Sequence, residues 1–211
     1  PPVRFPAHVD TPVVRTHNGQ ADQAAAVIAW PTGGGSAGIT EARKVDILAA
    51  VFRDRLLEQL RSQAGVSYSP NVVSNWPVGL PSGGAVLAVG LVPPDKTDFF
   101  FMLARSIAAD LVANPISADE LRRALVPLVQ SLSRQSSGNL FWMQQVDGGT
   151  VDPARIAAVN TLAQDVVRTT PEELQAMARK YLNPARDWTM VVLPEQAAHA
   201  PAPRTGADVG R

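Results

Sequence analysis

Apolar residues recur at three- and four-residue steps between residues 40 and 64, which is the spacing of one face of an α-helix. Charged residues, among them Arg43 and Arg53, fall on the other side. Thr40 is placed to cap the start of this helix, and Gly65 to end it, because the residue after a helix often adopts positive φ, which glycine tolerates. The pattern predicts a long helix that packs on a core through Val45, Leu48, Phe52, Leu56 and Leu60.

The flanking segments predict strands. Gln23–Trp30 is a short apolar run that ends at a proline, and Gly84–Val92 is almost entirely apolar, which suits a central strand. Val66–Asn75 is predicted to pair with Gly84–Val92 as an antiparallel hairpin across a proline- and glycine-rich turn. The glycine-rich residues 32–38 are predicted to be a loop, because the lysine and hydroxyl of a phosphate-binding loop do not follow them.

The rest of the chain reads mainly as helices. One stripe contains Phe99, Met102, Leu103, Ile107 and Leu111. Ser117 to Glu120 has the sequence of a capping box, and Pro127 should kink the helix that follows. Pro153 and Pro171 each stand at the first position of a further helix, and 188–194 is a closing strand.

This order of elements predicts one α+β domain, with an antiparallel-leaning sheet and helices packed on one face. The proline-dotted residues 1–20 are expected to form a linker, residues 12–194 the domain, and residues 195–211, rich in Ala, Pro and Gly, a flexible tail. Because the chain begins Pro1-Pro2 without an initiator Met, we expect an excised piece of a longer polypeptide or a processed product.

Composition excludes several classes of function. The formal net charge is +0, so nothing favours a nucleic-acid or anionic-membrane partner. The absence of cysteine excludes thiolate nucleophiles and Cys-based metal sites, and no apolar run reaches the ~18 residues of a membrane span.

No reaction centre emerges from the side chains. His8, His17 and His199 stand in proline- or glycine-rich surroundings and show no metal-binding spacing, and no nucleophile elbow is present. The paired carboxylates 119–120 and 172–173 sit in first helical turns, where they complement the helix dipole. Phe141 and Trp142 are expected to be a core aromatic pair, with a pocket lining as the alternative.

The corner between the long helix and the next strand holds two polar side chains of different type. Arg61 falls in the last helical turn and Tyr68 early in the strand. The guanidinium of Arg61 and the phenol of Tyr68 can both donate hydrogen bonds to a peptide carbonyl oxygen or to a developing oxyanion. Taken by themselves, they are more typical of a solvated helix-end cation and an ordinary strand aromatic.

These residues resemble a known family. Leu60-Arg61, Gly65 and Tyr68-Ser69 are similar to the "Leu-Arg-x-x-x-Gly-x-x-Tyr-Ser" signature of the insulinase-like (pitrilysin) zinc metallopeptidases, in the domain that lacks zinc. Asn139-x-x-Trp142, Thr170-Pro171-Glu172-Glu173 and the closing strand agree in kind and order, so the resemblance spans residues 12–194. Ser67 stands where Ala is commoner, and Pro70 interrupts the predicted strand.

The resemblance implies a division of labour. A homologous domain, in the same chain or in a partner subunit, would carry zinc on an inverted His-x-x-Glu-His motif, which this sequence lacks. Arg61 would hold the backbone of a peptide or unfolded-protein substrate, and Tyr68 would donate to the oxyanion. The fragment alone is then expected to bind no zinc and to be inactive.

Two further expectations accompany this interpretation. The alternative function is a non-catalytic, scaffolding subunit of the same fold. The absence of cysteine and the Ala/Pro-rich linkers favour a periplasmic protein, with the cytoplasm as the other possibility.

Overall fold

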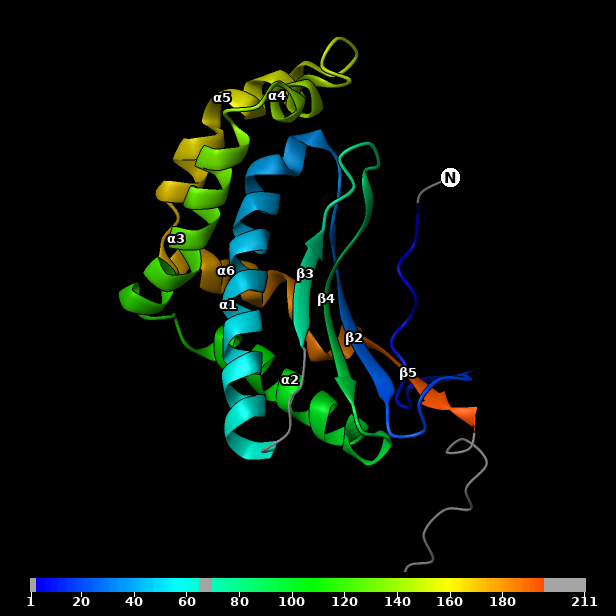
Figure 1. The fold of residues 1–211 in the computed structure, drawn as a ribbon. Helices are drawn as coiled ribbons and strands as arrows, with labels where there is room; N and C mark the ends of the chain where they lie inside the picture. The colour runs from blue at the N-terminus through cyan, green and yellow to red at the C-terminus, as the bar shows by residue number, and fades with distance from the viewer. Residues whose placement is uncertain (1–2, 65–69, 196–211) are drawn as a thin grey trace, which may run out of the picture.

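The domain is built on a five-stranded mixed sheet (Figure 1). The structure, a computed structural model, describes residues 3–64 and 70–195. The strand order is β1-β5-β2-β4-β3; β1 runs parallel to β5, and the other neighbours are antiparallel. The strands are β1 (Val13–His17), β2 (Ala24–Gly33), β3 (Asn71–Asn75), β4 (Ser82–Val92) and β5 (Trp188–Pro194). The predicted α+β class and the hairpin of β3 and β4 are confirmed.

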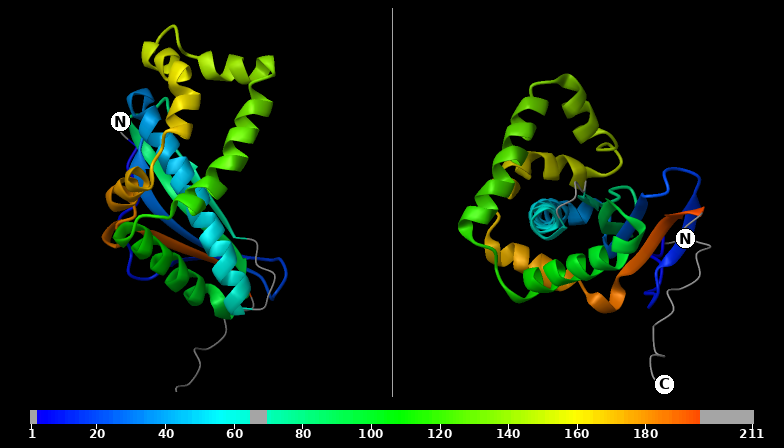
Figure 2. Two further views of the ribbon diagram at one scale, coloured as in Figure 1. Left: turned by 90° about the vertical axis from the view of Figure 1, so that its left-hand side faces the viewer. Right: turned by 60° about the horizontal axis from the view of Figure 1, so that its bottom comes forward.

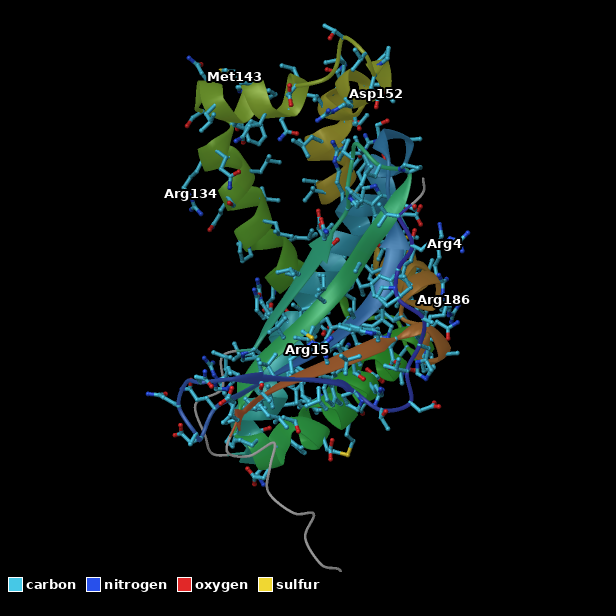
Figure 3. All side chains as sticks on the ribbon, turned by 90° about the vertical axis from the view of Figure 1, so that its right-hand side faces the viewer. Arg4, Arg15, Arg134, Met143, Asp152 and Arg186 are labelled. Atoms are coloured by element: carbon cyan, nitrogen blue, oxygen red, sulfur yellow. The ribbon has the colours of Figure 1, made fainter. Side chains whose placement is uncertain are left out.

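Helices cover one face of this sheet, as predicted (Figure 1). Three of them, α3, α4 and α5, form an arch that extends past the end of the sheet; Arg134, Met143 and Asp152 mark the path of the arch (Figures 2 and 3). The helices are α1 (Ile39–Ala64), α2 (Thr97–Ala113), α3 (Ala118–Gln135), α4 (Asn139–Val146), α5 (Pro153–Val167) and α6 (Pro171–Tyr181), with 3₁₀ turns at Ser36–Gly38, Pro94–Lys96 and Pro184–Arg186.

The long helix α1 lies inside a ring of other helices (Figure 2, right). All five residues of its predicted stripe are at most 1% exposed. Ile47, Ala49 and Val51, on other sides of the helix, are also buried, because α2, α3, α5 and α6 all contact α1. Arg43 is only 8% exposed, so its predicted solvent-facing position is wrong.

Several local predictions need correction at helix ends. Thr40 is not the cap of α1, because a 3₁₀ turn precedes the helix and Ile39 already belongs to it. Ser117 does cap α3, but the Glu120 carboxylate does not return to the backbone of Ser117; it pairs with Arg55 instead. Met102 is 59% exposed and does not join the core of α2.

The Phe141–Trp142 pair does not enter the core. The two rings meet edge to face, with centroids 5.1 Å apart, and Trp142 is 45% exposed. Both rings line a surface hollow of about 350 Å³ together with residues of α3 and α5. The pocket alternative therefore describes them better than the core.

Strands also differ from their predicted limits. Residues 13–17, within the predicted linker, form β1. Only two of these residues are half-buried and the other three are exposed, so the strand has almost no apolar alternation, which is why its pairing with β5 left no sign in the sequence. The strand predicted from Val66 begins at Asn71, and residues 65–69 of that prediction lie outside the described residues.

Within the described ranges, no single helix is long and apolar enough to cross a membrane. The segments Pro94–Ala113 and Ala118–Gln135 meet the length and composition requirement together, but they are bent by 112° against each other.

The N-terminal segment runs along the side of the sheet away from α1 (Figure 1) and is held there by a buried carboxylate. Asp187, just before β5, is 0% exposed, and one of its carboxylate oxygens accepts a 2.8 Å hydrogen bond from Nε of Arg105. His8 Nδ1 lies 2.8 Å from the carbonyl oxygen of Asp187 and 2.9 Å from its other carboxylate oxygen. His8 thus has buried partners, which its place in a predicted linker did not suggest.

We expect the attachment of this segment to weaken as the pH rises. Hydrogen bonding to the carbonyl of Asp187, together with the nearby carboxylates of Asp187 and Asp10, raises the pKa of His8 above 6.5. A raised folded-state pKa stabilises the fold fully below the unfolded-state value and ceases to do so as the pH passes the folded-state value. The difference in unfolding free energy between the native protein and His8→Gln should therefore be largest below pH 6 and shrink above neutrality. A difference that grows with pH would contradict this assignment.

Candidate functional site

Arg61 lies in the last turn of α1 with its side chain exposed. Leu60 beside it is 0% exposed, so the helix end is fixed to the core while the guanidinium faces outward. Arg61 lines a shallow hollow of about 430 Å³ with Asp54, Glu58 and two other residues of the same helix. Within the described part of the chain, the Arg61 guanidinium makes no ion pair or hydrogen bond.

Tyr68 and Gly65 lie outside the described residues, so their predicted positions stay predictions. The elements on either side of residues 65–69 are well defined. Helix α1 ends at Ala64, and β3 begins at Asn71, where it pairs with Val89 of β4. Because α1 packs directly against β3, both ends of the connection are attached to rigid elements. Arg61 is the one of the two candidate residues whose position the structure gives.

The end of α1 is clamped to α2 and α3 through Arg55. Its Nε and Nη2 donate to the two carboxylate oxygens of Glu120, at 2.5 and 3.0 Å, and its Nη1 donates to Asp110 at 2.5 Å. The hydrogen bonds that Arg55 donates to Glu120 raise the pKa of its guanidinium. This two-pronged pairing fixes the rotation of α1 about two turns before Arg61.

Removing Glu120 should therefore loosen the region that presents Arg61. We expect Glu120→Ala to lower the free energy of unfolding by about 2 kcal/mol, since charge-assisted hydrogen bonds of a partly buried pair contribute that order. Urea unfolding followed by circular dichroism measures it.

The matched control is Asp119→Ala, one residue earlier in the same helical turn. Asp119 pairs only with Arg122 and Arg123 of its own helix, and those side chains are 73% and 68% exposed. Its removal should cost less than about 1 kcal/mol. Equal losses in the two variants would show that Arg55 does not depend on Glu120.

The described histidines hold structural positions. His8 binds the Asp187 backbone, and His17 Nε2 lies 2.8 Å from the carbonyl oxygen of Gln23. His199 falls outside the described residues. Among residues 3–64 and 70–195, no group of three or more His, Asp or Glu side chains is placed to hold a metal ion.

Two features of the arch have no counterpart in the sequence patterns. Arg43 of α1 forms a buried ion pair with Asp165 of α5, and Asp46, one turn later, faces a cavity of about 440 Å³. Each arises from residues more than 100 positions apart in the chain, so no local spacing marks them.

Several solved structures of peptidases and peptidase domains share this fold. A scan against protein-family models and a search of curated protein sequences found no match. The periplasmic protease PqqL from Escherichia coli matches 90% of this chain with a TM-score of 0.70 and 19% identity, and the match covers 21% of PqqL. A peptidase M16 inactive domain from Pseudomonas fluorescens matches 92% of the chain with a TM-score of 0.70 and 16% identity, and the match covers 46% of that protein.

A third structure matches almost end to end. The inactive peptidase domain of a putative zinc protease from Bordetella parapertussis has a TM-score of 0.67 and 15% identity, and the match covers 85% of this chain and 97% of that one. The chain therefore has the fold of M16-like peptidase domains, including domains described as inactive, and the predicted resemblance is confirmed at the level of fold. It spans about a fifth of PqqL and under half of the Pseudomonas protein.

Proposed function

We propose that this chain is the zinc-free, substrate-clasping domain of a zinc metalloendopeptidase. Support comes from the nearly full-length agreement with the inactive domain of the Bordetella zinc protease. The agreement with only a part of PqqL supports an arrangement in which a second, zinc-carrying domain completes the enzyme.

The observation that carries the proposal is the exposed Arg61 in the last turn of α1, whose guanidinium has no partner among residues 3–64 and 70–195. Buried Leu60 fixes the end of the helix to the core, and the exposed guanidinium of Arg61 beside it can donate to the carbonyl oxygens of an extended peptide. Tyr68, seven residues later, would donate to the oxyanion that forms when water attacks the scissile carbonyl. Both roles need the partner domain to close over the substrate.

Zinc, in this proposal, is bound by the partner domain, which lies in the same chain or in another subunit. When bound, zinc polarises the carbonyl and activates water. This chain supplies Arg61, which binds the substrate backbone, and Tyr68, which donates one hydrogen bond to the oxyanion. The substrate is a peptide or an unfolded protein. A periplasmic location is proposed because PqqL is described as a periplasmic protease.

A scaffolding subunit of the same fold is the competing proposal, because a fold alone does not carry catalysis. It predicts no dependence of any peptidase activity on this chain.

Reconstitution separates the two proposals. The zinc-carrying half and this chain are purified separately, and hydrolysis of a fluorogenic unfolded protein is measured for each and for the mixture. We expect the mixture to be active and each half to be inactive, because neither half closes the chamber alone. A zinc-carrying half that is equally active without this chain would overturn the clasping role.

A further inference from the structure

A cavity of about 440 Å³ lies between the first half of α1, β3 with the turn after it, and the arch. Its polar lining comes from three separate parts of the chain: Asp46 on α1, Ser74 and Trp76 at β3, and Gln144, Gln145 and Arg155 from α4 and α5. Cavities of this size and mixed character hold small organic ligands. The cavity is far from Arg61: 15 residues of helix separate Asp46 from Arg61, which is about 22 Å at 1.5 Å per residue.

Asp46 offers this cavity a carboxylate that makes no ion pair with any described residue. The nearest cation, Arg43, is already engaged with Asp165 and donates to the carbonyl oxygen of Ala158 at 2.6 Å. Asp46 is exposed on the cavity side of α1, and the protein atoms around its carboxylate partly desolvate it, which raises its pKa to about 6. Arg43 and the hydroxyl of Ser74 oppose the rise.

Ser74 adds an unused polar group to the same wall. Its Oγ is fully buried and has no partner at hydrogen-bond geometry, although it lies close enough to Asp46 to influence it. A buried hydroxyl without a partner costs free energy, and a ligand that bonds to it recovers that cost. The Asp46 carboxylate and the Ser74 hydroxyl can together accept hydrogen bonds from a cation with several N–H donors, such as an ammonium group.

Arg155 provides the opposite charge on the facing wall. It lies in the first turn of α5, where its backbone N–H donates to the carbonyl oxygen of Asp152, but its guanidinium makes no ion pair or hydrogen bond with any described residue. Asp46 and Arg155 line one cavity and yet do not pair with each other. An unpaired anion and an unpaired cation across a small cavity, with two glutamine amides beside them, match a ligand that carries both charges.

We infer that this cavity binds a small zwitterion of the amino-acid or short-peptide class, with its ammonium group on Asp46 and Ser74 and its carboxylate on Arg155. Gln144 and Gln145 are placed to bond the remaining carbonyl or amide groups. The indole of Trp76, whose Nε1 is fixed by a 3.0 Å hydrogen bond to the carbonyl oxygen of Gly35, provides the apolar contact. The inference does not depend on the proposed function, because no residue of the Arg61 hollow takes part.

Binding of three matched dipeptides to the 211-residue chain tests this inference. The probes are glycyl-leucine, its N-acetyl form without the ammonium, and its C-terminal amide without the carboxylate. Isothermal titration calorimetry at pH 7.5 should give a dissociation constant for glycyl-leucine at least about tenfold lower than for either capped form, since each lost charged contact costs that order.

Two variants assign the ends of the ligand. Asp46→Asn should remove the preference for the free ammonium and keep that for the carboxylate, whereas Arg155→Gln should do the reverse. Neither side chain makes an ion pair with a described residue, and the raised pKa of Asp46 means that its charge does not stabilise the fold at pH 7.5. Neither variant should therefore unfold at a lower urea midpoint than the native chain. Asp119→Asn and Arg134→Gln, which lie outside the cavity, should bind like the native chain.

The pH dependence gives an independent readout. Asp46 faces Arg43 of its own helix, Arg155 of α5 and the neutral Ser74, Trp76, Gln144 and Gln145. Only Asp46 among these groups titrates near neutrality, so affinity for glycyl-leucine should fall as the pH is lowered through about 6. No binding by glycyl-leucine, equal binding by the capped dipeptides, or affinity unaffected by both variants would overturn the inference.

Discussion

Replacing Tyr68 by Phe in the complete enzyme should lower kcat by roughly 10²–10³-fold, the usual cost of one lost oxyanion donor. The substitution removes a single hydroxyl and keeps the ring, so the connection between α1 and β3 should fold as before. The contact is proposed to strengthen only as charge develops on the carbonyl oxygen, so KM should change much less than kcat. Steady-state kinetics on a fluorogenic peptide measures both constants.

The only other tyrosine of the chain supplies the matched control. The Tyr181 hydroxyl donates to Glu41 at 2.8 Å, on the side of α6 that contacts α1. Tyr181→Phe should therefore lower stability slightly and leave kcat unchanged. If Tyr68→Phe turns over peptides at the native rate, the proposed role of Tyr68 is wrong, whereas a fall in activity caused by misfolding would appear in the unfolding curve.

Arg61 should respond differently from Tyr68, because it is proposed to hold the ground state of the substrate. Arg61→Lys keeps the charge but loses the planar fork of donors. We expect a rise in KM of about tenfold with a smaller change in kcat, since uniform binding affects KM first. A kcat effect as large as that of Tyr68→Phe would place Arg61 at the oxyanion instead.

Replacing Arg43 by Met should give the largest loss of stability, about 3 kcal/mol. Arg43 is only 8% exposed, and it ties α1 to α5 through the Asp165 carboxylate, the Ala158 carbonyl and the Thr161 hydroxyl. Methionine fills much of the volume but leaves Asp165 as an uncompensated, largely buried charge, and breaking one side of such a pair typically costs 3–5 kcal/mol. Urea unfolding measures the loss.

Two comparisons isolate the charge effect. Arg53→Met, on the same helix, breaks only an exposed pair with Asp54 and should cost less than about 1 kcal/mol. The double variant Arg43→Met with Asp165→Leu should recover most of the lost stability, because replacing a whole buried pair by apolar residues is often neutral. A single Arg43→Met variant as stable as Arg53→Met would show that the pair does not anchor the arch.

Local patterns were sufficient for most of the elements. The stripe of α1, the apolar strand β4, the hairpin with β3 and the prolines that begin α5 and α6 each express a rule that operates within a few residues. The position of Arg61 in the last turn of α1 follows from the same spacing, whereas the position of Tyr68 stays a prediction, because this residue lies outside the described residues.

The ends of helices and strands were harder to predict from the sequence, because tertiary contacts compete with local ones. Glu120 has the position of a capping-box residue but pairs with Arg55, 65 positions earlier, since a bidentate ion pair is stronger than a cap. The box that does form lies at Thr170 and Glu173. Thr40 likewise does not cap α1, because a 3₁₀ turn leads into the helix, and its hydroxyl donates to Asp165.

The sequence by itself determined the α+β class, the apolar stripe by which α1 packs on the core, and the place of Arg61 at the end of that helix. These features follow from helix and strand periods, which are local properties. Only the tertiary structure decided which polar residues meet. The parallel pairing of β1 with β5, the burial of Arg43 against Asp165 and the cavity shared by Asp46 and Arg155 join segments about 110 to 180 positions apart. Such contacts depend on how the arch and the sheet close around α1, and no spacing along the chain records that closure.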